Sequence, residues 1–281
     1  MQLQKKIEEL FVLEVMELQR KDVLPVFNEL KFFLNKGEIR SAELINAEWK
    51  VNLWVKKGIL LGFRAGIFSE IKSDSVFRFF DKDLLSVKNI ALEDNIRIVP
   101  GGSIIRDGCF VGKNVIVMPP AYINIGAYVD EGTLVDSHAL VGSCAQIGKR
   151  VHLSAGAQIG GVLEPIGSLP VIIEDDVFIG GNTGIFEGVI IKKGAVLAAG
   201  VQLTSSTPVY DIVHQTVHKK TEITPLIIPE NAVVVMGTRS INNKWAQESF
   251  LSIYTPVIIK YRDEKTSRSA ALEQSLRFEM E

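Results

Sequence analysis

The sequence predicts a mainly β fold: a parallel β-helix between an N-terminal helical domain and a small C-terminal β-rich cap. Two observations carry this prediction. Branched aliphatic residues recur at every sixth position in the middle of the chain, and a small or β-branched residue mostly stands two positions before each of them. The repeated aliphatic positions are Val99, Ile105, Val111, Val117, Ile123, Val129, Val135, Val141, Ile147, Leu153 and Ile159, followed by Ile173, Ile179, Ile185, Ile191 and Leu197.

A period of six fits neither an amphipathic helix nor an alternating strand, and it is typical of the hexapeptide β-helix. In that fold each hexad forms one side of a triangular coil, and residues about eighteen apart stack in neighbouring coils. Hexapeptide repeats are known for left-handed coils, so the predicted hand comes from recognising the repeat. We interpret the fourteen residues from Ile159 to Ile173 as two hexads plus two extra residues, in a loop near 160–170.

Residues 1–92 are predicted to form the N-terminal helical domain, which caps the open first coil. Apolar residues at helical spacing predict helices over 3–14, over 26–34 after Pro25, and from near Ala47 to Phe63. We expect 66–83 to be an irregular link whose aromatic residues serve packing. These aromatic residues are Phe77, Phe79 and Phe80.

The β-helix is predicted over 93–205 and the C-terminal cap over 206–281. Polar residues in 204–229 indicate a hairpin, because the hexads fade after Leu203. Apolar runs at 232–236 and 254–261 predict strands, and 267–278 predicts a closing helix of moderate amphipathicity.

Composition indicates an ordinary globular protein, with 281 residues, 47% hydrophobic residues and a net charge of −2. No basic excess points to nucleic acid, and no apolar run is long enough to span a membrane. The N-terminal segment carries early acidic residues, unlike a secretory signal. Cys109 and Cys144 lie too far apart in the coil register for a disulfide. We therefore expect a cytoplasmic protein with reduced thiols.

Asp136 is the leading candidate for chemistry in the array. It directly follows the inward Val135 and precedes Ser137 and His138, and a histidine can act as a general base near neutral pH. A structural alternative stays open, because Asp and Ser commonly bond to turn backbone and a turn histidine is often only solvated. No metal site is expected, because zinc needs several converging ligands and only His138 and His152 lie in the array, in different hexad positions.

Arg97 interrupts the small-residue pattern that precedes the inward positions. Two interpretations remain open. The residue either belongs to the segment leading into the first coil, or it binds an anion, because a guanidinium can hold a carboxylate with two hydrogen bonds.

With these residues laid out, the sequence resembles the tetrahydrodipicolinate N-succinyltransferase family over nearly its whole length. The most specific segment is the run YINIGAYVDEGTLVDSHALVGSCAQIGKRVHLSAGAQIGGVLEP. Further similar segments are 51–64, 97–100, 172–180 and 253–278. The resemblance implies a left-handed β-helix and a homotrimer with sites between neighbouring subunits. It also implies transfer of succinyl from succinyl-CoA, a co-substrate and not a bound cofactor, to the amine of L-2-amino-6-oxopimelate in the diaminopimelate and lysine pathway.

By the same resemblance, Asp136 matches the family's active-site aspartate, and Arg97 matches an arginine that binds the substrate carboxylate. The chain departs from the family at two points. Gly184 aligns with a glutamate held to be catalytic, and His138 stands where the family often has tryptophan. Glu187 is the nearest acid, but the family also has a glutamate there, so it need not be a replacement. We expect a rearranged acid/base set in which Asp136 acts with His138, with Glu187 as the further candidate.

Counting hexads with two loop residues removed puts Ile185 two coils and two sides after Val135, so Asp136 and Gly184 are expected on different faces. Two prisms packed around a threefold axis can bring such faces together. The acyl-CoA is expected to lie along the prism, against the stacked positions Gly181 and Ala199. The alternatives are a related acyltransferase with another donor or acceptor, and a catalytically silent β-helix kept for assembly.

Overall fold

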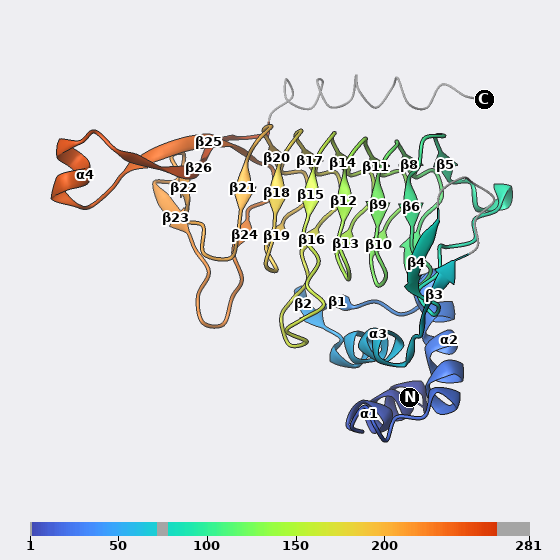
Figure 1. Cartoon of the computed structure of the whole chain (residues 1–281). Coiled ribbons are helices and arrows are strands. Elements are labelled where there is room, and N and C mark those ends of the chain that lie inside the picture. Colours follow the sequence, from blue (N-terminus) through green and yellow to red (C-terminus); the bar gives the residue numbers. More distant parts are fainter. Residues whose placement is uncertain (1, 72–77, 263–281) are drawn as a thin grey trace.

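The hexads form three parallel sheets that face outward around a common aliphatic core, as Figure 1 shows for residues 2–71 and 78–262 of this computed structural model. Face 1 contains β5 (Arg97–Ile98), β8 (Ile116–Val117), β11 (Leu134–Val135), β14 (His152–Leu153), β17 (Phe178–Ile179) and β20 (Val196–Leu197). Face 2 contains β6 (Ile104–Ile105), β9 (Tyr122–Ile123), β12 (Leu140–Val141), β15 (Gln158–Ile159), β18 (Gly184–Ile185) and β21 (Gln202–Leu203). Face 3 contains β7 (Phe110–Val111), β10 (Tyr128–Val129), β13 (Gln146–Ile147), β16 (Ile172–Ile173), β19 (Ile190–Ile191) and β24 (Ile227–Ile228).

The chain passes through faces 1, 2 and 3 in turn, so each coil has three corners, which stack into the 1/2, 2/3 and 3/1 edges of a prism. Most paired residues in neighbouring coils are eighteen apart, as in Leu134 opposite His152 and Leu140 opposite Gln158. The second residue of nearly every strand points inward and is buried. Three stacked parallel sheets of this kind are typical of a left-handed β-helix, which confirms the predicted fold class.

The register differs from the prediction at the first coil. Ile98, not Val99, lies opposite Val117. This coil holds one extra residue at Gly101 and Gly102, both of which have positive φ. The inward column predicted to begin at Val99 therefore begins in full at Val117.

The loop after β15 is longer than predicted. Ile147 lies opposite Ile173, which is twenty-six residues on and not eighteen, so the loop contributes eight extra residues and not two. The fourteen residues from Ile159 to Ile173 thus cover one side of the prism and this insertion. The buried Lys56 holds the loop by donating a hydrogen bond to the carbonyl of Ser168.

Three helices precede the coils: α1 (Gln2–Phe11), α2 (Arg20–Lys36) and α3 (Leu53–Ala65). They pack through buried residues that include Ile7, Phe27, Leu30 and Ile59. The prediction of helix from near Ala47 was wrong, because β1 (Ala42–Ile45) and β2 (Glu48–Val51) form a hairpin there. Asn46 and Ala47 both have positive φ, as a two-residue turn of type I′ requires.

β3 (Phe68–Ile71) and β4 (Phe79–Lys82) pair antiparallel, so the predicted irregular link was wrong for these two stretches, and its middle part, 72–77, lies outside the described residues. Phe68 stacks on Phe80 at 6.5 Å between ring centroids, yet both rings remain exposed, and Phe79 is exposed too. Phe77 lies outside the described residues. A short 3-10 helix, η1 (Leu92–Asp94), leads into the first coil.

The N-terminal segment covers face 3. Gly37, at the end of α2, lies against the rings of Phe110 and Tyr128, and Ser41 donates a hydrogen bond to the carbonyl of Cys144. Ala42 forms a small buried cluster with Ile172 and Ile190. In Figure 1 the helices accordingly lie along one side of the prism.

At the far end, β22 (Val209–Asp211) and β23 (Thr216–His218) form the predicted hairpin. The two predicted strands are confirmed as β25 (Ala232–Ser240) and β26 (Ser252–Tyr261), which pair along their length. Their antiparallel ribbon extends face 1 and projects from the prism, with α4 (Lys244–Glu248) at its tip (Figure 1).

The helix predicted over 267–278 lies outside the described residues, and the domain boundaries at 92 and 205 stay predictions. In residues 2–71 and 78–262, no helix has the length and apolarity that crossing a bilayer requires.

Candidate active site

Asp136 lies on the 1/2 edge, at the corner after β11. Its backbone N–H donates to the carbonyl of Leu153 at 3.0 Å, which fixes the corner in the ladder between coils. Its Oδ1 accepts the N–H of Ser137 at 2.7 Å. The half-buried carboxylate is therefore oriented through one oxygen, as the structural alternative anticipated, and no described residue donates to the other.

His138 is exposed on the same corner and has a φ of 61°. The equivalent corner positions in later coils are Gly156, Asn182 and Gly200, residue types that tolerate this left-handed conformation well. The backbone N–H of His138 donates to the carbonyl of Pro120 at 2.7 Å. No described side chain forms a hydrogen bond with its imidazole, so the ring has no fixed partner within the described part of the chain.

Arg97 lies on face 1, in the outward row that continues through Ile116 and Leu134. It is exposed and two strands away from β11. With the usual strand spacing, its backbone is about 10 Å from that of Leu134. The structure therefore puts Arg97 and Asp136 on the same side of the prism.

Gly181 and Ala199 lie on the same 1/2 edge as Asp136, in the corners after β17 and β20. They stack one coil apart, as predicted, and the N–H of Gly200 donates to the carbonyl of Gly181 at 2.9 Å. A Cβ added to Gly180 would lie 2.4 Å from the backbone nitrogen of Ala199. The glycine and alanine residues of these corners leave much of the backbone uncovered, and the Met236 side chain lies close to Gly200.

Glu187 is not brought to Asp136 within one chain, because it lies on the 2/3 edge after β18. Its Oε2 accepts hydrogen bonds from the backbone N–H and the hydroxyl of Ser205, at 3.1 and 2.7 Å. The predicted separation of Ile185 from Val135 by two coils and two sides was wrong, since the eight-residue insertion makes it two coils and one side. The expectation of different faces is confirmed.

Gly184 lies at the outward position of β18, where an added side chain would have to displace its neighbours. A Cβ there would lie 2.1 Å from Oε1 of Gln202 and 2.5 Å from the ring of Phe186. Gln202 is held over this spot by a hydrogen bond from its Nε2 to the carbonyl of Asn182 at 2.9 Å. Sequence reasoning missed Gln202, although its place eighteen residues after Gly184 was the available signal.

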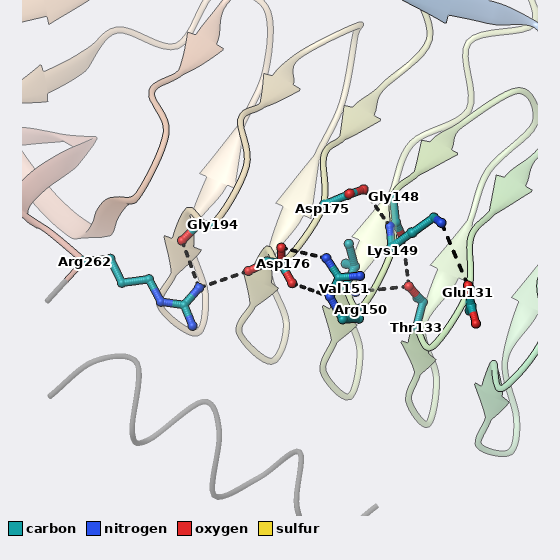
Figure 2. Close-up of polar contacts among 10 residues, drawn as sticks. All are labelled: Glu131, Thr133, Gly148, Lys149, Arg150, Val151, Asp175, Asp176, Gly194 and Arg262. Carbon is teal, nitrogen blue, oxygen red and sulfur yellow. Dashed lines mark hydrogen bonds and ion pairs between the residues drawn. The ribbon is translucent and has the colours of Figure 1, made fainter. Parts of the chain in front are cut away.

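The 3/1 edge differs from the 1/2 edge because charged side chains tie its corners together (Figure 2). Arg150 donates two hydrogen bonds to Asp176, at 2.7 and 2.9 Å, and this contact raises the pKa of the guanidinium above its usual value. The buried Thr133 hydroxyl donates to the carbonyl of Gly148 at 2.9 Å and accepts the N–H of Val151 at 3.0 Å. These contacts serve the stacking of coils.

The remaining three histidines contact other side chains of the chain, as expected for a structural role. The ring of His152 is nearly buried, 4.5 Å from that of Phe178 between centroids. His214 and His218 both approach the carboxylate of Asp211, at 2.9 and 3.5 Å. Across the described ranges, no three His, Cys, Asp or Glu side chains converge as a metal site would require.

Comparisons with known proteins agree with this architecture. Residues 2–65 match the family model "Tetrahydrodipicolinate N-succinyltransferase N-terminal", and residues 170–205 match "Hexapeptide repeat of succinyl-transferase". A 2,3,4,5-tetrahydropyridine-2,6-dicarboxylate N-succinyltransferase of Legionella pneumophila (strain Corby) is 44% identical over 261 residues, covering 91% of this chain and 89% of the relative. The chain belongs to the tetrahydrodipicolinate N-succinyltransferase family. The family predicted from the sequence is thereby confirmed.

A second member of the tetrahydrodipicolinate N-succinyltransferase family, from Burkholderia mallei (strain SAVP1), is 44% identical over 248 residues, which cover 87% of this chain and 86% of the relative. A crystal structure of a putative 2,3,4,5-tetrahydropyridine-2-carboxylate N-succinyltransferase from Campylobacter jejuni is 14% identical, with a TM-score of 0.46, covering 88% of this chain and 64% of that one.

Proposed function

We propose that this chain transfers the succinyl group of succinyl-CoA to the amine of L-2-amino-6-oxopimelate, the ring-opened form of tetrahydrodipicolinate, in diaminopimelate and lysine biosynthesis. The supporting observation is 44% identity to named N-succinyltransferases over 91% of the chain. The partly uncovered backbone of the 1/2 edge and the oriented carboxylate of Asp136 agree with it.

In this reaction the substrate amine attacks the thioester carbonyl, a C–N bond forms, the C–S bond breaks and CoA leaves as its thiol. The amine must first lose a proton, so a base is needed beside it. We assign this role to Asp136, because one of its oxygens is fixed by the Ser137 N–H and the other is left for the substrate ammonium. The proton then passes to the departing thiolate, directly or through water.

The substrate and the acyl donor are assigned to the same side of the prism. Arg97 is proposed to bind a substrate carboxylate, because its guanidinium is exposed on face 1 about two strand spacings from Asp136. The pantetheine arm is proposed to run along Gly181 and Ala199, where the edge presents backbone with little side-chain bulk. His138 is the second candidate base, and Glu187, bonded to Ser205, is the weaker one.

We further propose a homotrimer with its sites between subunits. Face 3 is covered by the chain's own N-terminal segment, whereas the outward row of face 1 is largely apolar and half-buried. Its apolar members are Ile116, Leu134, Phe178 and Val196. Neighbouring copies of the chain would bury this row and bring a second face to the Asp136 edge. A cytoplasmic location is proposed as well, because the two cysteines are free.

A thiol-release assay tests the reaction, with 2-aminopimelate as the acceptor and succinyl-CoA or acetyl-CoA as the donor. Acceptor-dependent release with succinyl-CoA is expected. Release with acetyl-CoA alone would support the alternative of another donor, which the difference at Gly184 and Gln202 favours. No release with either donor would support the silent β-helix.

Asp136→Asn tests the assigned base. Turnover should fall by about a hundredfold or more, the range typical of a lost general base, while the melting temperature stays close to that of the wild type. His138→Ala and Glu187→Gln are the parallel variants. A Asp136→Asn protein with full turnover would exclude Asp136, and an unchanged pH profile in His138→Ala would exclude His138.

A further inference from the structure

A charged cleft lies between the β1–β2 hairpin and face 3, beside the 3/1 edge. It is separated from Asp136, which lies on the 1/2 edge of the same chain. The cavity has a volume of about 380 Å³. Its charged lining residues are three cations, Arg40, Lys192 and Lys193, and four carboxylates, Asp130, Glu174, Asp175 and Glu230.

One wall of the cleft is held in place by contacts between the hairpin and the coils. Trp49 donates its indole N–H to Oε1 of Glu174 at 3.0 Å, and Lys192 donates to the same oxygen at 2.8 Å. This shared acceptor fixes the indole ring and one ammonium relative to face 3. The indole contributes a flat apolar surface next to Leu44 and Ala47.

Arg40 is equally well fixed. Its guanidinium stacks on Tyr128 at 3.6 Å from the ring centroid, and its Nε donates to Oε1 of Gln146 at 2.8 Å. Gln146 is 1% exposed, so this partner cannot move away. Burial lowers the pKa of Arg40, and nearby Tyr128, Asp130, Glu43 and Asp175 counteract that effect. Arginine nevertheless stays charged at neutral pH, so a rigid cation faces the cleft.

Other charged groups of the cleft have bonding capacity left. Among the described residues, neither the Lys193 ammonium nor the Glu230 carboxylate forms an ion pair. Asp130 and Asp175 each use Oδ1 to accept a backbone N–H, from Glu131 at 2.8 Å and from Lys149 at 2.9 Å. Figure 2 shows Asp175 bonded to Lys149 in this way. The second oxygen of Asp175 remains for a ligand, whereas the Asp130 carboxylate also accepts a hydrogen bond from the Tyr128 side chain.

We propose that this cleft binds a small aliphatic amino acid with carboxylate and ammonium groups at its ends. A ligand with carboxylates alone would meet Asp130, Asp175 and Glu230 without compensation, and a diamine would meet Arg40 and Lys193 in the same way. A ligand that carries both charges satisfies both sets, and its aliphatic chain packs on Trp49. The site is distinct from the acyl-transfer edge and does not depend on that reaction.

Titrations of the full-length protein with three seven- or five-carbon probes test this proposal. The probes are 2,6-diaminopimelate, which has both charges at each end, pimelate, which has carboxylates alone, and 1,5-diaminopentane, which has ammonium groups alone. Tryptophan fluorescence includes the signal of Trp49 among the three tryptophans of the chain, and calorimetry gives a second readout that does not depend on the indole. Saturable binding is expected for 2,6-diaminopimelate and at least tenfold weaker binding for the other two probes.

Variants then locate the binding. Lys193→Ala and Glu230→Ala change exposed side chains and should each weaken 2,6-diaminopimelate binding about tenfold or more, as expected when a ligand loses a charged partner. Lys113→Ala is the matched control, because Lys113 is exposed at the equivalent corner after β7, outside the cleft. Asp136→Asn removes a contact of the acyl-transfer edge and should leave the Lys193-dependent binding of 2,6-diaminopimelate in place.

Three outcomes would overturn the proposal: no saturable binding of 2,6-diaminopimelate, equal binding of pimelate or 1,5-diaminopentane, or equal affinities in Lys193→Ala and Lys113→Ala. Loss of binding in Asp136→Asn would instead assign the ligand to the acyl-transfer edge and would also reject a separate site. None of these results bears on turnover in the thiol-release assay.

Discussion

The space where a side chain of residue 184 would lie is occupied by the side chains of Gln202 and Phe186. Gln202 and Phe186 would both lie within 2.5 Å of an added Cβ. The family resemblance puts a glutamate here, and a side chain at this position would require the end of Gln202 and the Phe186 ring to shift. We infer that Gly184 and Gln202 are coupled.

Gly184→Ala should therefore lower the free energy of unfolding by about 1 to 3 kcal/mol, the usual cost of overpacking. Thermal and denaturant unfolding measure this loss. The double variant Gly184→Ala/Gln202→Ala should recover part of it, because the 2.1 Å contact disappears while the contact with Phe186 remains. Additive effects of the two substitutions would contradict the coupling.

The cysteines give a second test at the level of single residues. Both are fully buried, and burial raises the pKa of Cys109 to about 12 and that of Cys144 to about 11, although Lys88 and Lys56 oppose the shifts. The reactive thiolate is therefore scarce at about pH 8, where a free cysteine begins to ionise. A chromogenic disulfide reagent should label neither thiol in the native protein and both after unfolding. Rapid native labelling would contradict this burial.

At the scale of elements, local repeats were predictable and insertions were not. The hexad period identified the inward residues of the coils because each coil stacks on the next one in sequence. The same period could not give the length of the loop. The fourteen residues from Ile159 to Ile173 fit two hexads with two extra residues as well as one hexad with eight extra residues. Only the pairing of Ile147 with Ile173 decides between these readings. The β1–β2 hairpin was missed because Trp49 and Val51 fit the apolar stripe of the following helix as well as they fit a strand.

The C-terminal cap contains a polar centre that the sequence did not reveal. Asp211 is 2% exposed and accepts hydrogen bonds from the Tyr261 hydroxyl at 2.7 Å and from the backbone N–H groups of Val213 and His214. Burial alone would raise the pKa of this carboxyl, but the hydrogen bonds, with that of the His214 ring first, lower it below its usual value. Asp211 also helps to raise the pKa of Tyr261 to about 12, mainly an effect of burial.

Asp211→Asn should destabilise the protein by about 3 kcal/mol, since buried donors lose a charged acceptor. The folded-state pKa lies below the unfolded one, so the stabilisation is complete above about pH 5 and is lost as the pH falls through the range near 4 and below. The difference in melting temperature between wild type and variant should therefore shrink on acidification. Glu222→Gln, at an exposed position of the cap, is the control. A difference that grows toward low pH would contradict this assignment.

At the scale of the whole molecule, the sequence predicted one side of the candidate site and missed the charged cleft. Asp136, Gly181 and Ala199 share an edge because they occupy equivalent hexad corners, which register alone can reveal. Arg40 and Gln146 are 106 residues apart and meet only because the hairpin folds back on face 3. No period in the sequence encodes that contact.

A substitution in the outward row of face 1 tests the proposed trimer. Ile116 lies in this row between Arg97 and Leu134, so a lysine there would put an ammonium group into the interface, at a cost of several kcal/mol. Light scattering should give the wild type three times the chain mass of 31.0 kDa and Ile116→Lys a smaller species with unchanged circular dichroism. Ile223→Lys is the control, because Ile223 is 92% exposed in the cap. If sites form between subunits, the dissociated variant should also lose turnover, whereas an active monomer would reject a shared site.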